Sequence, residues 1–284
     1  MAALRAAILI RGVYNFKANP LNQWWFMAEA LSIGDRLEFG FWEAGCMIWV
    51  GAKDFASQDY EGFCNLLWDN DQEKLKAAIL EQKAFLAMDL YQDDGYNVRV
   101  VMGELNEQES DEWVARVRWR LDLSCGQMVV SGVLGDEEEF DDIAEARAIA
   151  DSSDSLQCFV EVPPNEYQVE VYSYAPGDLS TGWGQIVKPD LFKPTAEIIA
   201  EPLKAYFERT RPNTTMPAWI GCEIEEDPDL LQKYYREAST QQYTDFVIRL
   251  SPVLEDLPPP ELVESGLVKW EFRKPERCPL GLIS

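Results

Sequence analysis

Residues 113–134 read WVARVRWRLDLSCGQMVVSGVL, and this stretch decides the fold class. From 113 to 123, apolar and polar side chains alternate almost without a break, and three arginines occupy the polar side. This period of two is typical of an antiparallel strand that is buried on one face. The Ser-Cys-Gly sequence at 124–126 favours a turn, so we expect 127–134 to return as the partner strand.

A second pair of strands is predicted after the first. Its members, 156–162 and 167–174, are joined by Pro163-Pro164-Asn165-Glu166, which has the residues that turns prefer. Between the two pairs, 141–150 favours a helix because it has good helix formers and an acidic first turn. Four strands and one inserted helix would make one half of a sandwich.

Further strands and helices are predicted on both sides of this central block. We expect strands at 1–10, 36–42, 46–52, 97–105, 243–250 and 267–273, the second and third of them paired as a hairpin. We expect helices at 72–88, at 195–210 with an interruption at Pro202, and at 227–238. The predicted fold class is α+β, rich in antiparallel strands arranged as hairpins, a meander or a sandwich, with a few packed helices.

Three regions are distinguished along the chain, in one or two domains. They are an N-terminal hairpin and helix region at 1–105, a central antiparallel sheet region at 106–185, and a C-terminal α+β region at 186–284. Gly, Ser and Pro concentrate between 177 and 194, which favours a boundary there. The alternative is a single body with a long loop.

The charge balance excludes several classes of function. The chain has 50 acidic and 25 basic residues, no histidine and a net charge of −25. Without imidazole there is no Ser-His-Asp triad, no Cys-His pair and no histidine metal ligand. A strongly negative protein also lacks the Lys and Arg surface that binds phosphate backbones. We therefore expect no direct binding to nucleic acid.

Cysteine usage and hydropathy bear on the compartment. The six cysteines are scattered and form no CxxC pair, which favours free, mostly buried thiols in a reducing environment. Residues 1–10 are apolar but lack the features of an export signal, and no segment is long and apolar enough to span a bilayer. The sequence predicts a cytoplasmic protein without a membrane segment.

Motifs for catalysis, cofactors and metals are not found. Asp69-Asn70-Asp71 starts like a calcium-binding loop, but Lys74 and Leu80 stand where Gly and Glu are required. There is no phosphate-binding glycine loop and no GxSxG elbow. We therefore predict no catalytic, cofactor-binding or metal-binding residues.

Three acidic runs are the most distinctive feature of the sequence. The first contains Asp136, Glu137, Glu138, Glu139, Asp141, Asp142 and Glu145, the second Glu223, Glu225, Glu226, Asp227 and Asp229, and the third Glu104, Glu107, Glu109, Asp111 and Glu112. Each run is explained either by a solvated surface or by recognition of a cationic protein, since complementary fields speed association. We predict that the partner-binding residues are Glu137, Glu138, Glu139, Asp141 and Asp142.

The predicted function is non-catalytic binding of a basic protein, of the inhibitor or immunity type. One alternative is a hydrolase with a carboxylate pair in a cleft, of which one member has a raised pKa. Another is a structural module that self-associates through Trp and Tyr patches. For Trp24-Trp25-Phe26, packing against the first hairpin is favoured over a surface position of one ring. Arg116, Arg118 and Arg120 are expected to pair with carboxylates across the sheet, or else to form a small anion site.

Overall fold

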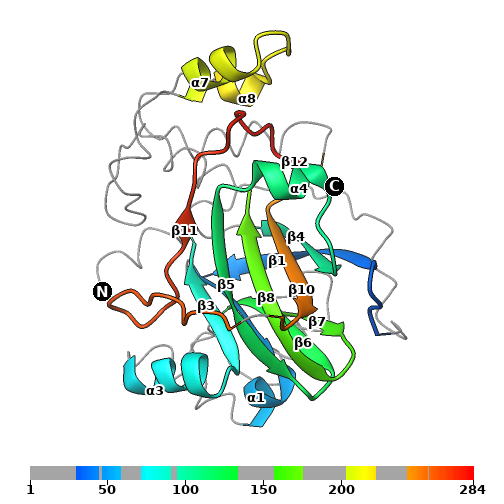
Figure 1. Cartoon of the computed structure of the whole chain (residues 1–284), viewed down its shortest axis with the longest axis vertical. Coiled ribbons are helices and arrows are strands. Elements are labelled where there is room, and N and C mark those ends of the chain that lie inside the picture. Colours follow the sequence, from blue (N-terminus) through cyan, green and yellow to red (C-terminus); the bar gives the residue numbers. More distant parts are fainter. Residues whose placement is uncertain are drawn as a thin grey trace, which may run out of the picture.

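The computed structural model describes residues 30–44, 47–58, 72–90, 95–133, 157–174, 203–221, 242–254 and 256–284. Strands dominate this part of the chain, and short helices lie around them (Figure 1). Ten strands form one sheet in the order β11-β5-β8-β10-β4-β1-β6-β2-β3, with β7 paired to β6. Most neighbouring strands are antiparallel, which confirms the predicted α+β class.

The elements are short, apart from a few long strands at the centre of the sheet. The strands of the large sheet are β1 (Arg36–Ala44), β2 (Met47–Ala52), β3 (Phe85–Asp89), β4 (Gly95–Met102), β5 (Ala115–Leu123), β6 (Gln127–Val133), β7 (Gln157–Glu161), β8 (Asn165–Ser173), β10 (Phe246–Pro252) and β11 (Glu271–Phe272). A separate pair consists of β9 (Tyr243–Thr244) and β12 (Leu282–Ile283). The helices are α1 (Lys53–Gln58), α3 (Gln72–Lys76), the π-helix η2 (Ala77–Glu81), α4 (Glu107–Glu112), α7 (Leu203–Thr210) and α8 (Ala218–Gly221).

The centre of the fold is one long, bent β-ribbon. β5 pairs with β8, and β6 pairs with β7, in one continuous antiparallel register from Ala115↔Ser173 to Ser131↔Gln157. The bend takes three residues on each strand, 124–126 and 162–164, and Val162 N donates a hydrogen bond of 2.9 Å to Gly126 O there. Gly126 has φ 77°, a conformation that glycine adopts without strain.

This ribbon corrects the predicted strand partners. We expected β5 to pair with β6 and β7 with β8, as two successive hairpins, and neither pairing occurs. The turn residues at 124–126 and 163–164 are present, but they carry each strand from one part of the sheet into another. Pairing β5 with the more distant β8 is favoured because both strands present buried residues at alternate positions to the same core.

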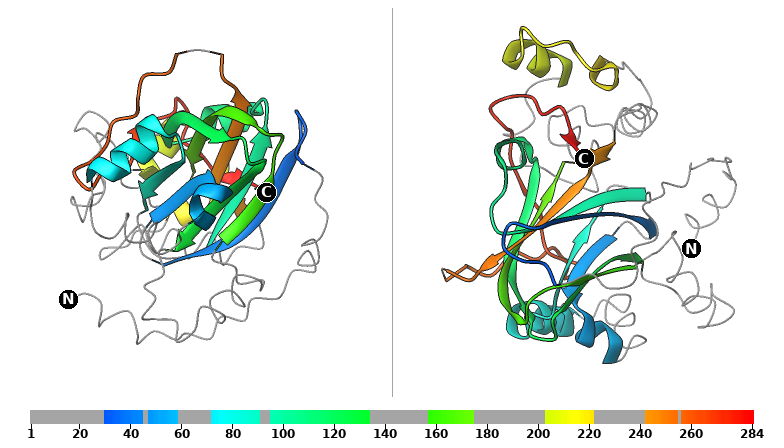
Figure 2. Two further views of the ribbon diagram at one scale, coloured as in Figure 1. Left: turned by 90° about the horizontal axis from the view of Figure 1, so that it is seen from below. Right: turned by 90° about the vertical axis from the view of Figure 1, so that its right-hand side faces the viewer.

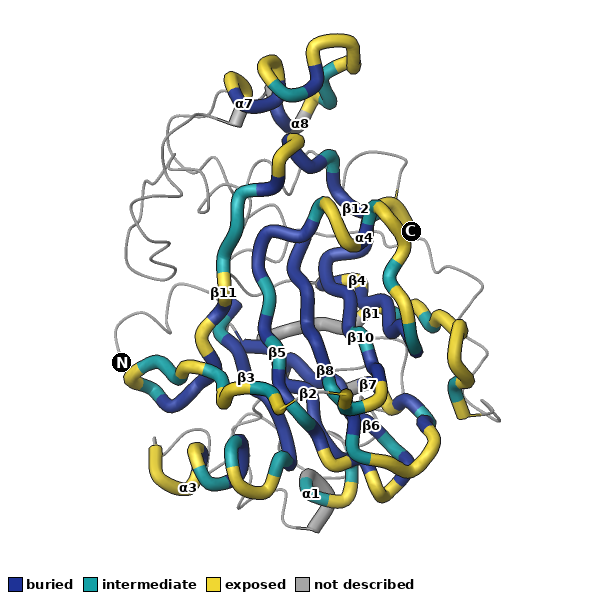
Figure 3. The backbone as a smooth tube through the Cα atoms, viewed as in Figure 1, coloured by how far each residue is buried: buried dark blue, intermediate teal, exposed yellow. Residues whose placement is uncertain are grey.

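The sheet curls until its two edges approach each other. Asp122 N, on β5, donates to Lys83 O, just before β3, at 2.9 Å. Val268 N donates to Ala87 O, at 2.8 Å, and the chain then continues into β11 beside β5. Figure 2 shows the strands curving around a common interior. The main hydrophobic cluster contains buried residues from all strands of the large sheet but β1 and β11, which add partly buried Leu37, Phe39 and Phe272. Of the long strands, β8 and β10 are buried along most of their length (Figure 3).

Two further predictions in the N-terminal third are wrong. β1 and β2 do not form a hairpin, because β1 pairs with β4 and, at its end, in parallel with β6. The helix expected over 72–88 ends with η2, and Phe85–Asp89 is a strand paired with β2. Lys83 has φ 54°, which ends the helical run. The apolar run that follows is buried on both faces and is used as a strand.

Other predicted elements agree with the structure or lie outside its description. β4 and β10 confirm the strands expected at 97–105 and 243–250, and α7 begins directly after Pro202. Of the strand expected at 267–273, only β11 is formed. The elements predicted at 1–10, 141–150 and 227–238 lie outside the described residues. The large sheet takes strands from all three predicted regions, and the division into domains stays a prediction.

A second layer covers part of the outer face of the sheet. α4 crosses this face at one end of β5, β8 and β10 (Figure 1), and a small apolar cluster lies there. It contains Val101, Trp113, Tyr172, Tyr174, Val247 and Leu282. Among the described helices, none is long and apolar enough to cross a membrane.

Candidate functional site

The five predicted contact residues, Glu137, Glu138, Glu139, Asp141 and Asp142, lie outside the described residues, as does the second acidic run. The structure does describe where their segment is attached. Residues 134–156 connect β6 to β7, and Ser131 and Gln157, near their ends, are directly opposite each other in the sheet. The first acidic run therefore lies in the segment that connects β6 to β7, the two strands at one end of the long ribbon.

The third acidic run is described, and it does not form a free acidic surface. Asn106 caps α4: its side chain accepts from Glu109 N, while the Glu109 side chain accepts from Asn106 N. Glu104, Glu109 and Glu112 each form an ion pair with an arginine from another element. Glu107 and Asp111 are exposed. Three of the five carboxylates thus serve contacts within the protein.

Charge is unevenly divided between the described residues and the rest of the chain. The described residues hold 23 acidic and 17 basic side chains, whereas the rest of the chain holds 27 acidic and 8 basic ones. The described body is thus close to neutral for its size. Most of the net charge of −25 belongs to the other segments, and 134–156 alone has nine acidic residues and one arginine.

Glu109 is the centre of a buried ionic network on the outer face of the sheet. Its side chain is 0% exposed and accepts hydrogen bonds from Arg36 and, at 3.0 Å, from Arg99 Nη1. Arg99 also donates to Glu38 at 2.6 Å and to Ile283 O at 3.0 Å. Burial alone would raise the pKa of Glu109, but the hydrogen bonds from Arg36, Asn106 N and Arg99 outweigh it, so its pKa is lowered.

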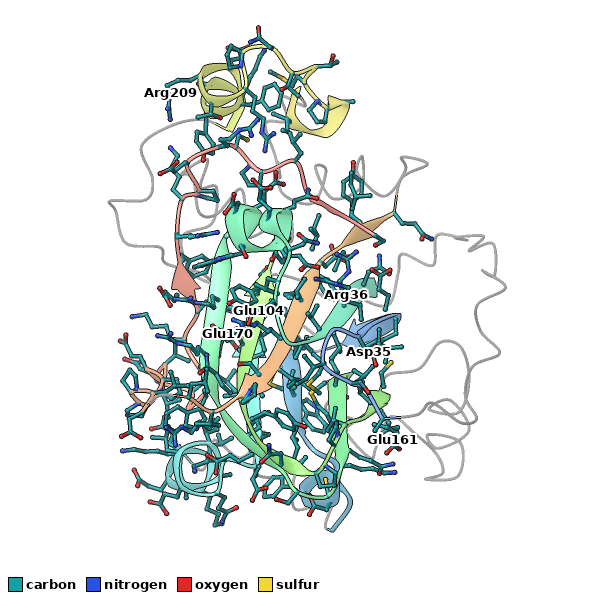
Figure 4. All side chains as sticks on the ribbon, turned by 45° about the vertical axis from the view of Figure 1, so that its right-hand side comes forward. Asp35, Arg36, Glu104, Glu161, Glu170 and Arg209 are labelled. Atoms are coloured by element: carbon teal, nitrogen blue, oxygen red, sulfur yellow. The ribbon has the colours of Figure 1, made fainter. Side chains whose placement is uncertain are left out.

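A second ionic group lies beside the first, around Glu170. Arg249 Nη1 donates to buried Glu170 at 2.9 Å, and Arg249 Nη2 donates to exposed Glu104 at 3.0 Å. Figure 4 shows Glu104 and Glu170 close together on this face. Burial and then the charge of Glu170 raise the pKa of Tyr172 to about 12. Both groups join neighbouring strands of the outer face: Arg99 of β4 pairs with Glu38 of β1, and Arg249 of β10 pairs with Glu170 of β8.

Arg116, Arg118 and Arg120 form a row on β5, for which we predicted either pairing with carboxylates or a small anion site. Two of the three arginines pair with carboxylates. Arg116 pairs with Glu271 at 2.7 Å and stacks on the Trp113 ring. Arg120 pairs with Asp256 at 3.1 Å. The first pair joins β5 to β11, and Asp256 lies in the segment after β10, so pairing with carboxylates is confirmed at these two positions. Arg118, between them, has no ion pair or hydrogen bond to a described residue.

A shallow hollow is the place where the hydrolase alternative can be tested. It has a volume of about 180 Å³ and contains two carboxylates, Asp54 and Asp122, among its lining residues. That alternative also requires a carboxyl group with a raised pKa in the same cleft. Burial raises the pKa of Asp89, which does not line this hollow. In the described part of the chain, the hollow with two carboxylates and the carboxyl group of Asp89, whose pKa is raised, therefore lie at different places.

The remaining candidates give no site among the described residues. Cys125 and Cys158 are free thiols, and burial raises the pKa of Cys158 to about 12. The described large apolar side chains that are exposed are Ile33, Phe159, Leu254 and Ile283, so they include no Trp or Tyr patch. No described group of three acidic or cysteine residues could hold a metal ion.

Fold and site together define an acidic α+β protein that is built on one curled sheet with an ionic outer face. No family model and no curated sequence matches the chain. A structure described as "Crocagin biosynthetic gene J" has a TM-score of 0.39 and 10% identity, over 78% of this chain and 100% of that one. ComJ from Bacillus subtilis, described as an inhibitor of the DNA degrading activity of NucA, has a TM-score of 0.27 and 9% identity, over 50% and 83% of the two chains. Neither TM-score is high enough to carry an inference.

Proposed function

We propose that this chain is a non-catalytic binding protein of the inhibitor or immunity type, and that its partner is a basic protein. The observation that carries the proposal is the distribution of charge. The segments outside the described body have 27 acidic and 8 basic residues, and the most acidic of them is 134–156. A dense negative field attracts a cationic partner and raises its association rate.

The attachment of this segment supports the proposal. The segment follows β6 at Val133 and precedes β7 at Gln157, and these two strands are paired, so both of its points of attachment lie on neighbouring strands. The contact residues that we propose are Glu137, Glu138, Glu139, Asp141 and Asp142. Within the body, by contrast, carboxylates such as Glu109 and Glu170 are already occupied by arginines. We also propose that the protein acts in the cytoplasm, which agrees with the free thiols of Cys125 and Cys158.

Neutralising the five proposed contact residues tests this function. A strongly basic protein is first captured from the source cells at low salt and eluted at high salt. We expect the variant with Gln at 137–139 and Asn at 141 and 142 to associate with it at least about tenfold more slowly at low salt, with a weaker dependence on ionic strength. Stopped-flow or surface-based kinetics at several salt concentrations measure both quantities.

The second acidic run provides a matched control, because it also contains five carboxylates. Neutralising Glu223, Glu225, Glu226, Asp227 and Asp229 removes the same charge from another segment. We expect a clearly smaller effect on the captured protein, and equal effects of both variants on a decalysine peptide. If the first variant binds the captured protein as fast as the unmodified chain does at every salt concentration, the proposal is wrong.

A further inference from the structure

β7 is an edge strand, because β6 is its only paired neighbour among the described strands. Its hydrogen bonds show which backbone groups this arrangement leaves open. Val162 N donates to Gly126 O, and hydrogen-bonded residues alternate along an antiparallel pair, so residues 158 and 160 direct their N–H and C=O groups toward β6. Residues 157, 159 and 161 direct theirs to the opposite side. We call these outward groups the open edge of β7.

The open edge already accepts one hydrogen bond of the kind that a further strand would make. Leu31 N, from the segment before β1, donates to Glu161 O at 3.0 Å. Two residues away, the backbone of Phe159 has no hydrogen bond to a described residue on this side. β1 approaches β7 only through a side chain, since the buried Cys158 Sγ lies 3.8 Å from Gly40 O. Phe159 is 41% exposed and Gly40 is also exposed, so solvent reaches this edge.

The surroundings of the open edge are acidic. Segment 134–156, with nine acidic residues and one arginine, ends directly before β7. Asp35 and Glu161 lie on the same side of the body (Figure 4), and their hydrogen-bond donors among the described residues are uncharged. The Phe159 ring already receives a cation, because Lys53 Nζ lies over it at 4.9 Å from its centroid. The edge is therefore suited to basic side chains.

We propose that the open edge of β7 is the docking place of an extended basic segment of the partner protein, which adds to the sheet as a further strand. This inference rests on the function proposed above and names the part of the body that the partner contacts. In strand addition, backbone hydrogen bonds provide affinity, here to the N–H and C=O groups of Phe159. A second copy of this chain could also pair with an edge strand, but a net charge of −25 opposes that contact and favours a basic segment.

The first test uses the full chain and two peptides of equal charge. The probe is acetyl-Lys-Val-Lys-Val-Lys-Val-Lys-amide, which favours an extended strand, and its control has Gly in place of each Val. We expect the valine peptide to bind saturably, to shift the amide signals of residues 157–161, and to slow hydrogen exchange of the Phe159 amide by about tenfold or more. The glycine peptide should bind about tenfold more weakly.

Two outcomes of this test would overturn the proposal. Equal binding of both peptides would show that charge alone attracts them and that no strand is added. A Phe159 amide that is as strongly protected in the free chain as those of Cys158 and Val160 would show that the edge is already paired. Neither measurement requires a variant, so the test does not depend on the folding of an altered chain.

Proline at position 159 separates docking at the edge from attraction by charge. Phe159→Pro removes an N–H that points away from β6, so it leaves the hydrogen bonds between β6 and β7 in place. We expect it to weaken binding of the valine peptide and of the captured basic protein by about tenfold or more. Phe159→Ala keeps the N–H and removes only the ring, so it should weaken binding by less than about threefold.

The two proposals can fail separately. If Phe159→Pro binds the captured protein as tightly as Phe159→Ala does, while neutralising the five contact residues still slows association, the docking edge is wrong and the proposed function stands. If neutralising those residues changes nothing, the proposed function is itself wrong. Urea denaturation of both variants at position 159 confirms that the compared chains are folded.

Discussion

Replacing Glu109 by glutamine is expected to lower the free energy of unfolding by about 3–5 kcal/mol. Glu109 is fully buried and accepts from both Arg36 and Arg99, and Arg99 is itself almost fully buried. Glutamine has nearly the same shape, but it leaves Arg36 without its carboxylate partner and removes one of the two carboxylates that pair with Arg99. Breaking a buried ion pair by removal of one partner costs more than the pair contributes, because a buried charge remains. Urea denaturation measures the difference.

Glu107 is the control for this substitution. It lies in the same first turn of α4, but its side chain is exposed. Glu107→Gln should therefore cost less than about 1 kcal/mol, the value of a favourable charge near a helix N-terminus. If the two variants unfold at the same urea concentration, the network around Glu109 does not stabilise the fold as described.

The pH dependence of stability provides a second readout for the same network. The pKa of Glu109 is lowered in the folded protein, so its stabilising contribution is complete above the unfolded pKa of about 4.3 and is lost as the pH falls through the folded pKa. We expect the difference in unfolding free energy between the unmodified chain and Glu109→Gln to be constant from about pH 6 to 8. It should shrink below about pH 4. A difference that grows with acidity would contradict the lowered pKa.

The sequence predicts strands better than it predicts their partners. Alternation at 115–123 identified β5 because every second side chain contacts the core. The turn residues at 124–126 and 163–164 indicate only that the chain changes direction, and a bend between two parts of a sheet requires the same residues as a hairpin. The pairing of β5 with β8 depends on a common core that no local pattern encodes.

The same limit applies to helix 72–88 and to the third acidic run. Phe85–Asp89 has the apolar content of a buried helix or a buried strand, and its pairing with β2 decides between them. Glu107 and Glu109 are equivalent in composition, yet only Glu109 is buried. One signal was present: Asn106 and Glu109 have the spacing of a capping box, which predicts the start of α4. The partners Arg36 and Arg99 come from distant strands and have no such signal.

Replacing Trp119 by alanine should cost about 3–5 kcal/mol of unfolding free energy. Trp119 lies on the inner face of β5 and belongs to the main hydrophobic cluster. Its Nε1 donates a hydrogen bond of 2.8 Å to Ile79 O, the carbonyl of a residue in η2. Alanine leaves a cavity in the core and removes the donor from a buried carbonyl group. Urea denaturation followed by circular dichroism measures the loss.

Two further variants separate the causes of this effect. Trp119→Phe keeps most of the ring volume but removes the N–H group, so it should cost about 1–3 kcal/mol and should loosen η2, as measured by amide hydrogen exchange. Phe159→Ala is the control for the loss of an aromatic ring, because Phe159 is 41% exposed on β7, and it should cost much less. Because Trp119 connects β5 to the helical segment that precedes β3, its removal should weaken the place where the two edges of the sheet meet. Equal losses for Trp119→Ala and Phe159→Ala would show that this interior is not the main core of the protein.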